Sequence, residues 1–105
     1  MAIAFDVLAE PNRQRILELI RNEEQPVGAL VRELHLSQPA VSKHLRILRE
    51  AGFVEVRSDA QRRLYRVRVE PLREIDAWLE PYRLMWTSSL NDLERHLDLI
   101  AEARE

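Results

Sequence analysis

The chain has 105 residues, of which 46% are apolar, so it is long enough to fold around one core as a single domain spanning residues 1–105. No apolar run approaches the roughly 18 residues that a membrane span needs, and no basic and then apolar leader begins the sequence. We therefore expect a soluble, cytoplasmic protein with no membrane partner. The lack of cysteine excludes disulfides, thiolate metal sites and cysteine redox chemistry.

Charge is unevenly distributed along the chain, although the net charge is only −2. Residues 37–69 hold eight basic and three acidic side chains, whereas residues 70–105 hold four basic and nine acidic ones. Such an asymmetry is typical of a protein that presents one face to a polyanion and another face to a different partner. Chance scatter explains the charges alone about as well, so the interpretation depends on the motifs.

The first 26 residues predict two helices and a connector. Phe5 and Leu8 indicate a short apolar helix. Pro11 suits the first turn of a second helix, because the N–H that proline lacks has no intrahelical partner there. The polar segment 22–26 (NEEQP) then predicts a connector.

Residues 27–51 have the pattern of a helix-turn-helix. Two apolar stripes at helical spacing predict a short helix and a longer one: Val27, Leu30, Val31 and Leu34, then Val41, Leu45 and Leu48. Residues 35–37 form the turn between them, and Ser37 is a good N-cap. Gly52 lies just past the second helix, where a left-handed residue is expected.

After Gly52 the apolar period changes from 3.6 to 2, which predicts a two-stranded β-hairpin over residues 53–69. Residues 53–57 and 64–69 are the expected strands, and residues 58–62 are a polar, basic tip. Alternation predicts that Tyr65, Val67 and Val69 point inward. The fold class is therefore mainly helical with a two-stranded hairpin wing, a winged helix-turn-helix.

Residues 71–103 predict the C-terminal helices. Pro71 opens this region, and Pro81 is expected to kink or break it because proline removes a backbone hydrogen bond. A stripe close to a heptad seam follows: Leu79, Tyr82, Trp86, Leu90, Leu93, Leu97 and Ile100. A small domain has limited room to bury such a stripe, so we expect a second copy of the chain to cover it.

The exposed side of the second helix in the helix-turn-helix carries the residues expected to contact double-stranded DNA. Gln38 can pair bidentately with adenine, Ser42 can bond a base edge or a phosphate, and Lys43 and Arg46 can reach guanine or phosphate. His44 either contacts DNA or packs at the helix–turn edge. The full set of expected DNA contacts, including the wing, is Ser37, Gln38, Pro39, Ser42, Lys43, His44, Arg46, Gln61, Arg62 and Arg63.

Three segments resemble the ArsR family of bacterial regulators. Leu8–Leu17 (LAEPNRQRIL) is similar to the second helix of that family, Leu36–Gly52 (LSQPAVSKHLRILREAG) to its recognition helix, and Arg62–Arg66 (RRLYR) to its wing. The resemblance implies a homodimer joined through the first and last helices. Phe5 and Leu8 then belong to the dimer interface together with the 79–100 stripe. It also implies binding to an inverted repeat and, usually, repression.

The metal chemistry of the family does not carry over to this sequence. The resemblance places Pro26, Val27 and Gly28 where many members hold a Cys-Val-Cys-type motif, and none of the three can bind a metal. Asp92, Glu94, His96 and Asp98 lie in the last helix but do not repeat the Asp-x-His unit of another subset. We therefore expect a metal-independent member with no cofactor, and a solvated helix face around His96.

Other functions have less support. An enzyme is not expected, because the sequence has no glycine-rich phosphate loop and no cysteine nucleophile. A non-specific nucleoid protein and a winged-helix protein-interaction module are the alternatives to a specific regulator. Trp78, Tyr82, Met85 and Trp86 cluster around Pro81, either as dimer core or as a pocket for an unidentified small apolar effector.

Overall fold

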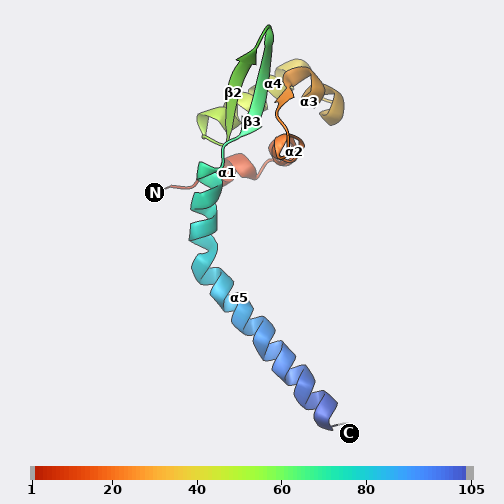
Figure 1. The fold of residues 1–105 in the computed structure, drawn as a ribbon, viewed down its shortest axis with the longest axis vertical. Coiled ribbons are helices and arrows are strands. Elements are labelled where there is room, and N and C mark those ends of the chain that lie inside the picture. The colour runs from red at the N-terminus through yellow and green to blue at the C-terminus, as the bar shows by residue number, and fades with distance from the viewer. Residues whose placement is uncertain (1, 104–105) are drawn as a thin grey trace. The chain divides into compact units, whose positions relative to one another are not determined.

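The computed structural model describes residues 2–103 as five helices and three strands. In chain order they are α1 (Phe5–Leu8), α2 (Pro11–Ile20), β1 (Gln25–Pro26), α3 (Val27–Leu34), α4 (Gln38–Glu50), β2 (Val54–Asp59), β3 (Arg62–Val67) and α5 (Glu70–Ala103) (Figure 1). Contacts divide the chain into two compact units, one up to Glu74 and one from Ile75 onward. The mainly helical fold with a β-hairpin wing confirms the predicted class.

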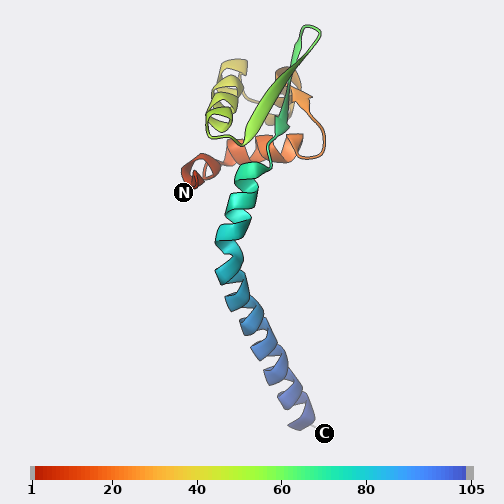
Figure 2. The same ribbon diagram turned by 60° about the vertical axis from the view of Figure 1, so that its left-hand side comes forward.

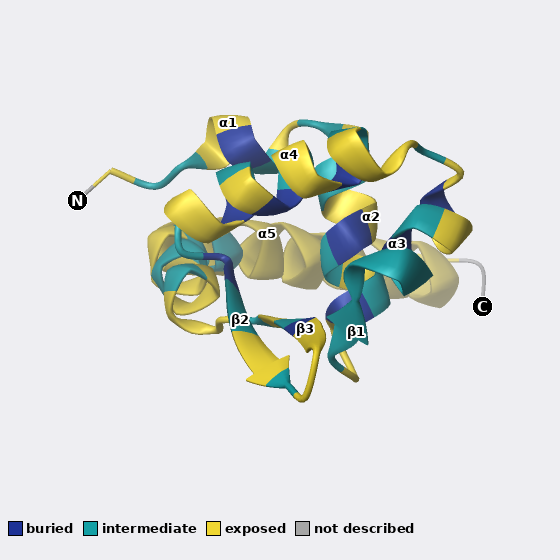
Figure 3. Ribbon diagram, turned by 90° about the horizontal axis from the view of Figure 1, so that it is seen from above, coloured by how far each residue is buried: buried dark blue, intermediate teal, exposed yellow. Residues whose placement is uncertain are grey.

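Helices α2, α3 and α4 bury the apolar stripes that the sequence predicted. Figure 3 shows the buried positions on the faces that these helices turn toward one another. The core consists of Val7, Ile16, Ile20, Leu30, Leu34, Val41, Leu45, Leu48, Phe53, Val54 and Leu64, each at most 9% exposed. Burying each large apolar side chain contributes about 1.5–3 kcal/mol, so this cluster holds α4 firmly against the other helices.

Local signals fix where the helices begin and end. Pro11 occupies the first turn of α2, and the Glu10 carboxylate accepts a hydrogen bond from the Arg13 backbone N–H at 3.0 Å. The Ser37 hydroxyl accepts from the Ala40 backbone N–H at 3.3 Å and caps α4, as expected. Gly52 has a φ of 85°, the left-handed conformation predicted after this helix.

The sheet has one more strand than the sequence predicted. Its order is β1-β3-β2, because Gln25 and Pro26 pair antiparallel with β3 rather than serving only as a connector. The hairpin between β2 and β3 is also tighter than expected. Asp59 pairs with Arg62, so only Ala60 and Gln61 form its tip (Figure 2).

The predicted alternation along β3 is confirmed for Tyr65 and Val67, which are more buried than Arg66 and Arg68, but it fails at Val69. Leu64 is the buried residue of this strand, whereas Tyr65 and Val67 are half-buried and Val69 is 47% exposed. Leu64 pairs with Pro26 on one side and Arg57 on the other. Burial in β3 is thus concentrated at Leu64, a residue that the simple alternation does not include among the inward positions.

Helix α5 continues through Pro81 as one helix, so of the two outcomes expected there, a kink or a break, the break does not occur. Arg83 bridges the turns on both sides of Pro81. Its guanidinium donates to the Asp76 carbonyl oxygen and lies 2.7 Å from the Asp76 carboxylate and 3.4 Å from that of Glu80. No helix within residues 2–103 is long and apolar enough to cross a membrane.

Candidate nucleic-acid interface

The turn between α3 and α4 directs one side of α4 outward. His35 ends α3 in the left-handed conformation, with φ 55° and ψ 37°, and the chain then reverses into the Ser37 cap. The buried stripe of α4 faces α2 and α3, which leaves its opposite side to solvent. Accordingly, these predicted DNA contacts are exposed: Ser37, Gln38, Pro39, Ser42, Lys43 and Arg46.

His44 lies on a different side of α4 from those residues. Its Nδ1 atom is 3.3 Å from the Arg13 guanidinium and 3.7 Å from the Glu10 carboxylate, both in the α2 region. Only 17% of its side chain is exposed. The geometry therefore favours packing over DNA contact, the two alternatives that the sequence left open for His44.

The wing tip and the start of α4 line a common hollow of about 360 Å³. Gln38 and Ser42 contribute from α4, and Gln61, Arg62 and Arg63 contribute from the tip and β3. Pro26, Val27 and Tyr65 complete the lining. Five of the predicted DNA-contact residues, from segments about 20 residues apart, thus border one concave surface.

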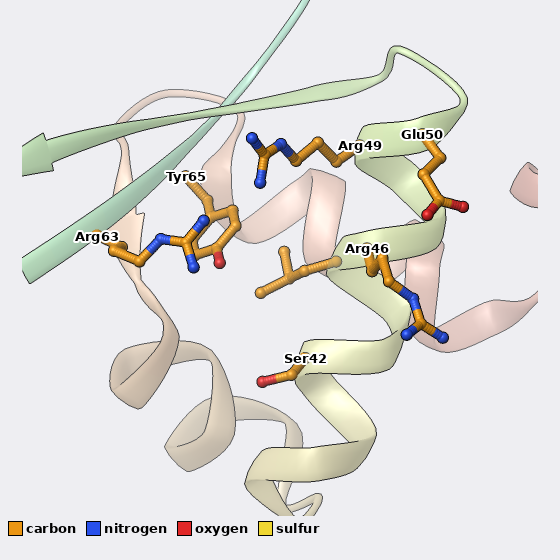
Figure 4. Close-up of a pocket in the computed structure, with 7 residues that line it drawn as sticks. Ser42, Arg46, Arg49, Glu50, Arg63 and Tyr65 are labelled. Carbon is orange, nitrogen blue, oxygen red and sulfur yellow. The ribbon is translucent and has the colours of Figure 1, made fainter.

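A second hollow, of about 490 Å³, lies between α4 and β3 and is drawn in Figure 4. Its lining consists of Ser42, Leu45, Arg46, Arg49, Glu50, Arg63 and Tyr65. Ser42, Arg63 and Tyr65 border both hollows.

Arg49 and Tyr65 are not among the DNA contacts that the sequence predicted. The spacing of Ser42, Arg46 and Arg49, which places them along one side of a helix, was a usable signal for Arg49.

The basic side chains of this surface fall into two groups. Arg62 pairs with Asp59 at 3.2 Å, and Arg66 pairs with Glu55 at 2.6 Å. By contrast, four basic residues make no ion pair with any residue between 2 and 103: Lys43, Arg46, Arg49 and Arg63. Arg46, Arg49 and Arg63 line the hollow of about 490 Å³, and Lys43 is exposed on α4, so the surface presents positive charge that no carboxylate of the described residues neutralises.

An ion pair joins β2 to the segment before β1. The single N–H of Arg57 Nε is shared between the two oxygens of the Glu24 carboxylate, at 2.8 and 3.0 Å, and Nη2 donates a further hydrogen bond to it. These hydrogen bonds hold the pKa of Glu24 below its usual 4.5 and raise the pKa of Arg57. The contact ties the middle of β2 to the chain that precedes β1.

Most of the expected dimer residues are exposed on α1 and α5, and Leu8 and Leu79 are half-buried. Phe5 is 43% exposed on α1, where Leu8 is half-buried. On α5, Leu79 is half-buried, and six residues of the stripe are between 38% and 59% exposed: Tyr82, Trp86, Leu90, Leu93, Leu97 and Ile100. The rings of Trp78 and Tyr82 lie 5.1 Å apart, and Met85 is 66% exposed. The second unit thus carries a continuous apolar stripe at its surface.

Side chains that could hold a metal ion do not gather in the part of the chain that the structure describes, where no cluster of three or more His, Asp or Glu residues occurs. Pro26 precedes α3 and pairs in β1, and Val27 and Gly28 form the first turn of α3.

A helix-turn-helix with a basic exposed side, followed by a β-hairpin that shares its concave surface, defines a winged-helix DNA-binding regulator. The profile of the bacterial regulatory protein arsR family matches residues 10–56. The chain belongs to the ArsR family, and it is a transcription regulator.

Relatives with curated names agree with this assignment. The HTH-type transcriptional regulator Rv2034 of Mycobacterium tuberculosis is 33% identical over 90% of this chain and 86% of its own length. The arsenic resistance transcriptional regulator ArsR1 of Pseudomonas putida is 42% identical over 74% of this chain and 62% of its own length. The biofilm growth-associated repressor of Agrobacterium fabrum is 37% identical over 64% and 57%, respectively.

Solved structures share the fold. The crystal structure of a possible transcriptional regulator for arsenical resistance has a TM-score of 0.69 and 35% identity, covering 78% of this chain and 85% of that one. The homodimeric winged helix-turn-helix DNA-binding domain Mb0332 of Mycobacterium bovis, solved by NMR, has a TM-score of 0.61 and 27% identity. That match covers 74% of this chain and 72% of the other.

Proposed function

We propose that this protein is a cytoplasmic, sequence-specific repressor that binds an inverted-repeat operator as a homodimer and has no catalytic role. The observation that carries the proposal is the hollow shared by α4 and the wing tip, which joins Gln38, Ser42 and Arg63 on one surface. Unpaired Lys43 and Arg46 lie on the same exposed side of α4. Such a surface suits a duplex that is both polyanionic and grooved.

In this proposal α4 is the recognition helix and enters the major groove. Gln38, at its N-terminal end, reads a base edge, and Ser42 bonds a base edge or a phosphate. Lys43 and Arg46 bind phosphate or guanine, and Gln61, Arg62 and Arg63 bring the wing to the adjacent backbone or minor groove. His44 has no part in it, because its side chain faces Glu10 and Arg13.

The apolar stripe of α5 supports the dimer. Six exposed apolar side chains follow one another along α5, and water contact with so much apolar surface is unfavourable. A second copy of α5 covers the stripe symmetrically, together with Phe5 and Leu8 of α1. Two recognition helices then lie about one DNA turn, ~34 Å, apart and face the two halves of a palindrome. The homodimeric state of the Mycobacterium bovis domain is consistent with this arrangement.

The proposal also includes repression of transcription and a function that needs no bound metal ion. A dimer bound across a promoter excludes other proteins from it, and the related Agrobacterium fabrum protein is named a repressor. The chain has no cysteine, and the resemblance to the family places Pro26 and Gly28 where many members hold thiolate ligands.

Selection of bound sequences from random duplex DNA at about physiological salt tests the proposal, because such salt suppresses part of the non-specific electrostatic binding. We expect a palindromic motif with half-sites about one turn apart. Recovery of no motif, with binding lost as salt rises, would instead identify a non-specific DNA binder. No binding at any salt concentration would point to a protein-interaction module.

A further inference from the structure

Four hydrogen-bond donors from two elements converge between α4 and β3. Figure 4 shows the guanidinium groups of Arg49 and Arg63 and the hydroxyls of Tyr65 and Ser42 directed toward the same space. Arg46 and Glu50 border the same hollow, but Figure 4 shows both side chains directed to the other side of α4. The converging set therefore contains two cations and two hydroxyls and no carboxylate.

This set has the chemistry of an anion site. Neither Arg49 nor Arg63 forms an ion pair with another residue between 2 and 103. An arginine fork matches the oxygen spacing of a phosphate, and hydroxyls donate to the remaining oxygens. Hydrogen bonds between ionised partners are roughly twice as strong as neutral ones, so a phosphate is favoured over a neutral ligand.

The path of the DNA backbone past the protein determines which phosphate reaches the site. The assignment of a DNA phosphate to this site rests on the proposed function. The major and minor grooves of a duplex are separated by one sugar–phosphate strand. When α4 lies in the major groove and the wing lies over the adjacent minor groove, that strand passes between α4 and the wing. The hollow of about 490 Å³ occupies this position in the fold.

We propose that Arg49, Arg63, Tyr65 and Ser42 together hold one phosphate of the DNA backbone where the strand passes between the recognition helix and the wing. A phosphate carries no sequence information, so these residues position α4 in the groove rather than read bases. The proposal thus assigns Ser42 to phosphate and adds Arg49 and Tyr65 to the DNA-contact surface. Base reading is left to Gln38 and its neighbours at the start of α4.

Single methylphosphonate substitutions along the selected duplex test the site, because each removes the charge of one phosphate. For the wild-type protein we expect one position per half-site at which the substitution weakens binding about tenfold or more. In Arg49→Ala and Tyr65→Phe the penalty at that position shrinks, while the penalties at other positions remain. Arg32→Ala, an exposed arginine on α3 that does not line the hollow, is the matched control and keeps the whole wild-type profile.

The salt dependence gives a second readout. Removal of one phosphate contact lowers the magnitude of the slope of log K against log salt by about 0.9. We expect this change in Arg49→Ala combined with Arg63→Ala, but not in Arg32→Ala. Retention of the full methylphosphonate profile in Arg49→Ala, together with the full salt slope in the double variant, would overturn the assignment even if the protein still binds its palindrome. Wild-type protein that binds no DNA would instead overturn the proposed function.

A free phosphate could supply the same chemistry, and inorganic phosphate distinguishes the two sources. DNA affinity is compared in phosphate and in chloride buffers of equal ionic strength. We expect similar affinity in both, since one isolated phosphate lacks the neighbouring contacts of the duplex. Specific competition by inorganic phosphate, together with a flat methylphosphonate profile at the two half-sites, would overturn the DNA assignment in favour of a small-molecule site.

Discussion

The guanidinium of Arg13 joins the N-terminal helices to the recognition helix, with its Nη1 atom 3.3 Å from Nδ1 of His44. Arginine can only donate, so Nδ1 is the acceptor in this hydrogen bond. The Nε atom of Arg13 also donates to the Val7 carbonyl oxygen at 2.6 Å. One side chain therefore bridges α1, α2 and the buried side of α4.

Replacing Arg13 should destabilise the fold more than replacing a neighbouring arginine. Arg13→Ala removes hydrogen bonds to two elements, and we expect the free energy of unfolding to fall by about 1.5–3 kcal/mol. Arg15→Ala is the control, because Arg15 is exposed and makes a single hydrogen bond of 3.3 Å to the Glu33 carbonyl oxygen. Urea unfolding of both variants measures the difference. Equal midpoints and slopes for the two would show that the Arg13 bridge contributes nothing.

The base-reading role of Gln38 predicts a change in specificity rather than in overall affinity. In Gln38→Ala we expect discrimination at one base pair of each half-site to fall by about 1–3 kcal/mol. Affinity for all single-base variants of the selected motif, measured by competition, gives this value. Gln14→Ala is the control, since Gln14 lies on α2 and donates to the Leu8 carbonyl oxygen. An unchanged preference in Gln38→Ala would remove Gln38 from base recognition.

The helices could be predicted from the sequence. The residues that form the candidate DNA interface could be predicted only in part. The stripes of α2, α3 and α4 repeat at the helical period, and local caps such as Ser37 and Gly52 mark their ends. The burial of Leu64 and its pairing with β1 were not predicted, because a two-residue strand leaves no periodic signal. Pairing between strands distant in sequence is decided by tertiary contacts, not by local pattern.

Arg49 and Tyr65 were missed for a similar reason. Each is unremarkable in its own element, one a basic residue near the end of a helix and the other an aromatic residue in a strand. Their common role arises only when α4 and β3 border the same hollow. His44 illustrates the converse, because the sequence left DNA contact and packing equally open and the contact with Arg13 favours packing.

The hairpin tip predicts a stabilising substitution. Ala60 has a φ of 57°, where a side chain with Cβ is disfavoured and glycine is not. We expect Ala60→Gly to raise the free energy of unfolding by about 0.5–1 kcal/mol. Ala29→Gly, within α3, is the control and should lower it by a similar amount. Thermal unfolding measures both. A loss of stability in Ala60→Gly as large as that in Ala29→Gly would contradict the strain assigned to Ala60.

The Arg57–Glu24 pair predicts a pH-dependent contribution to stability. The folded state lowers the pKa of Glu24 below 4.5, so the contribution is present above the unfolded pKa and is lost as pH falls through the folded one. Glu24→Gln should therefore melt below the wild type at pH 7, and the two should converge as pH drops toward 3. Glu23→Gln is the control at a neighbouring exposed position. A constant difference across this pH range would show that the ion pair is not its cause.

The stripe on α5 predicts which single change dissociates the dimer. Leu93 lies within the stripe and is 53% exposed, so Leu93→Glu would bring a carboxylate into an apolar interface between two copies. We expect sedimentation to report a monomer and operator affinity to fall by at least a hundredfold, because each half-site is then bound alone.

Leu99→Glu makes the same change at a residue that is 64% exposed but lies beside the stripe, and it should leave the dimer intact. A monomeric Leu93→Glu protein that still binds the palindrome with wild-type affinity would contradict the dimeric mode of binding. Dissociation by both substitutions would instead place the interface on a broader face of α5.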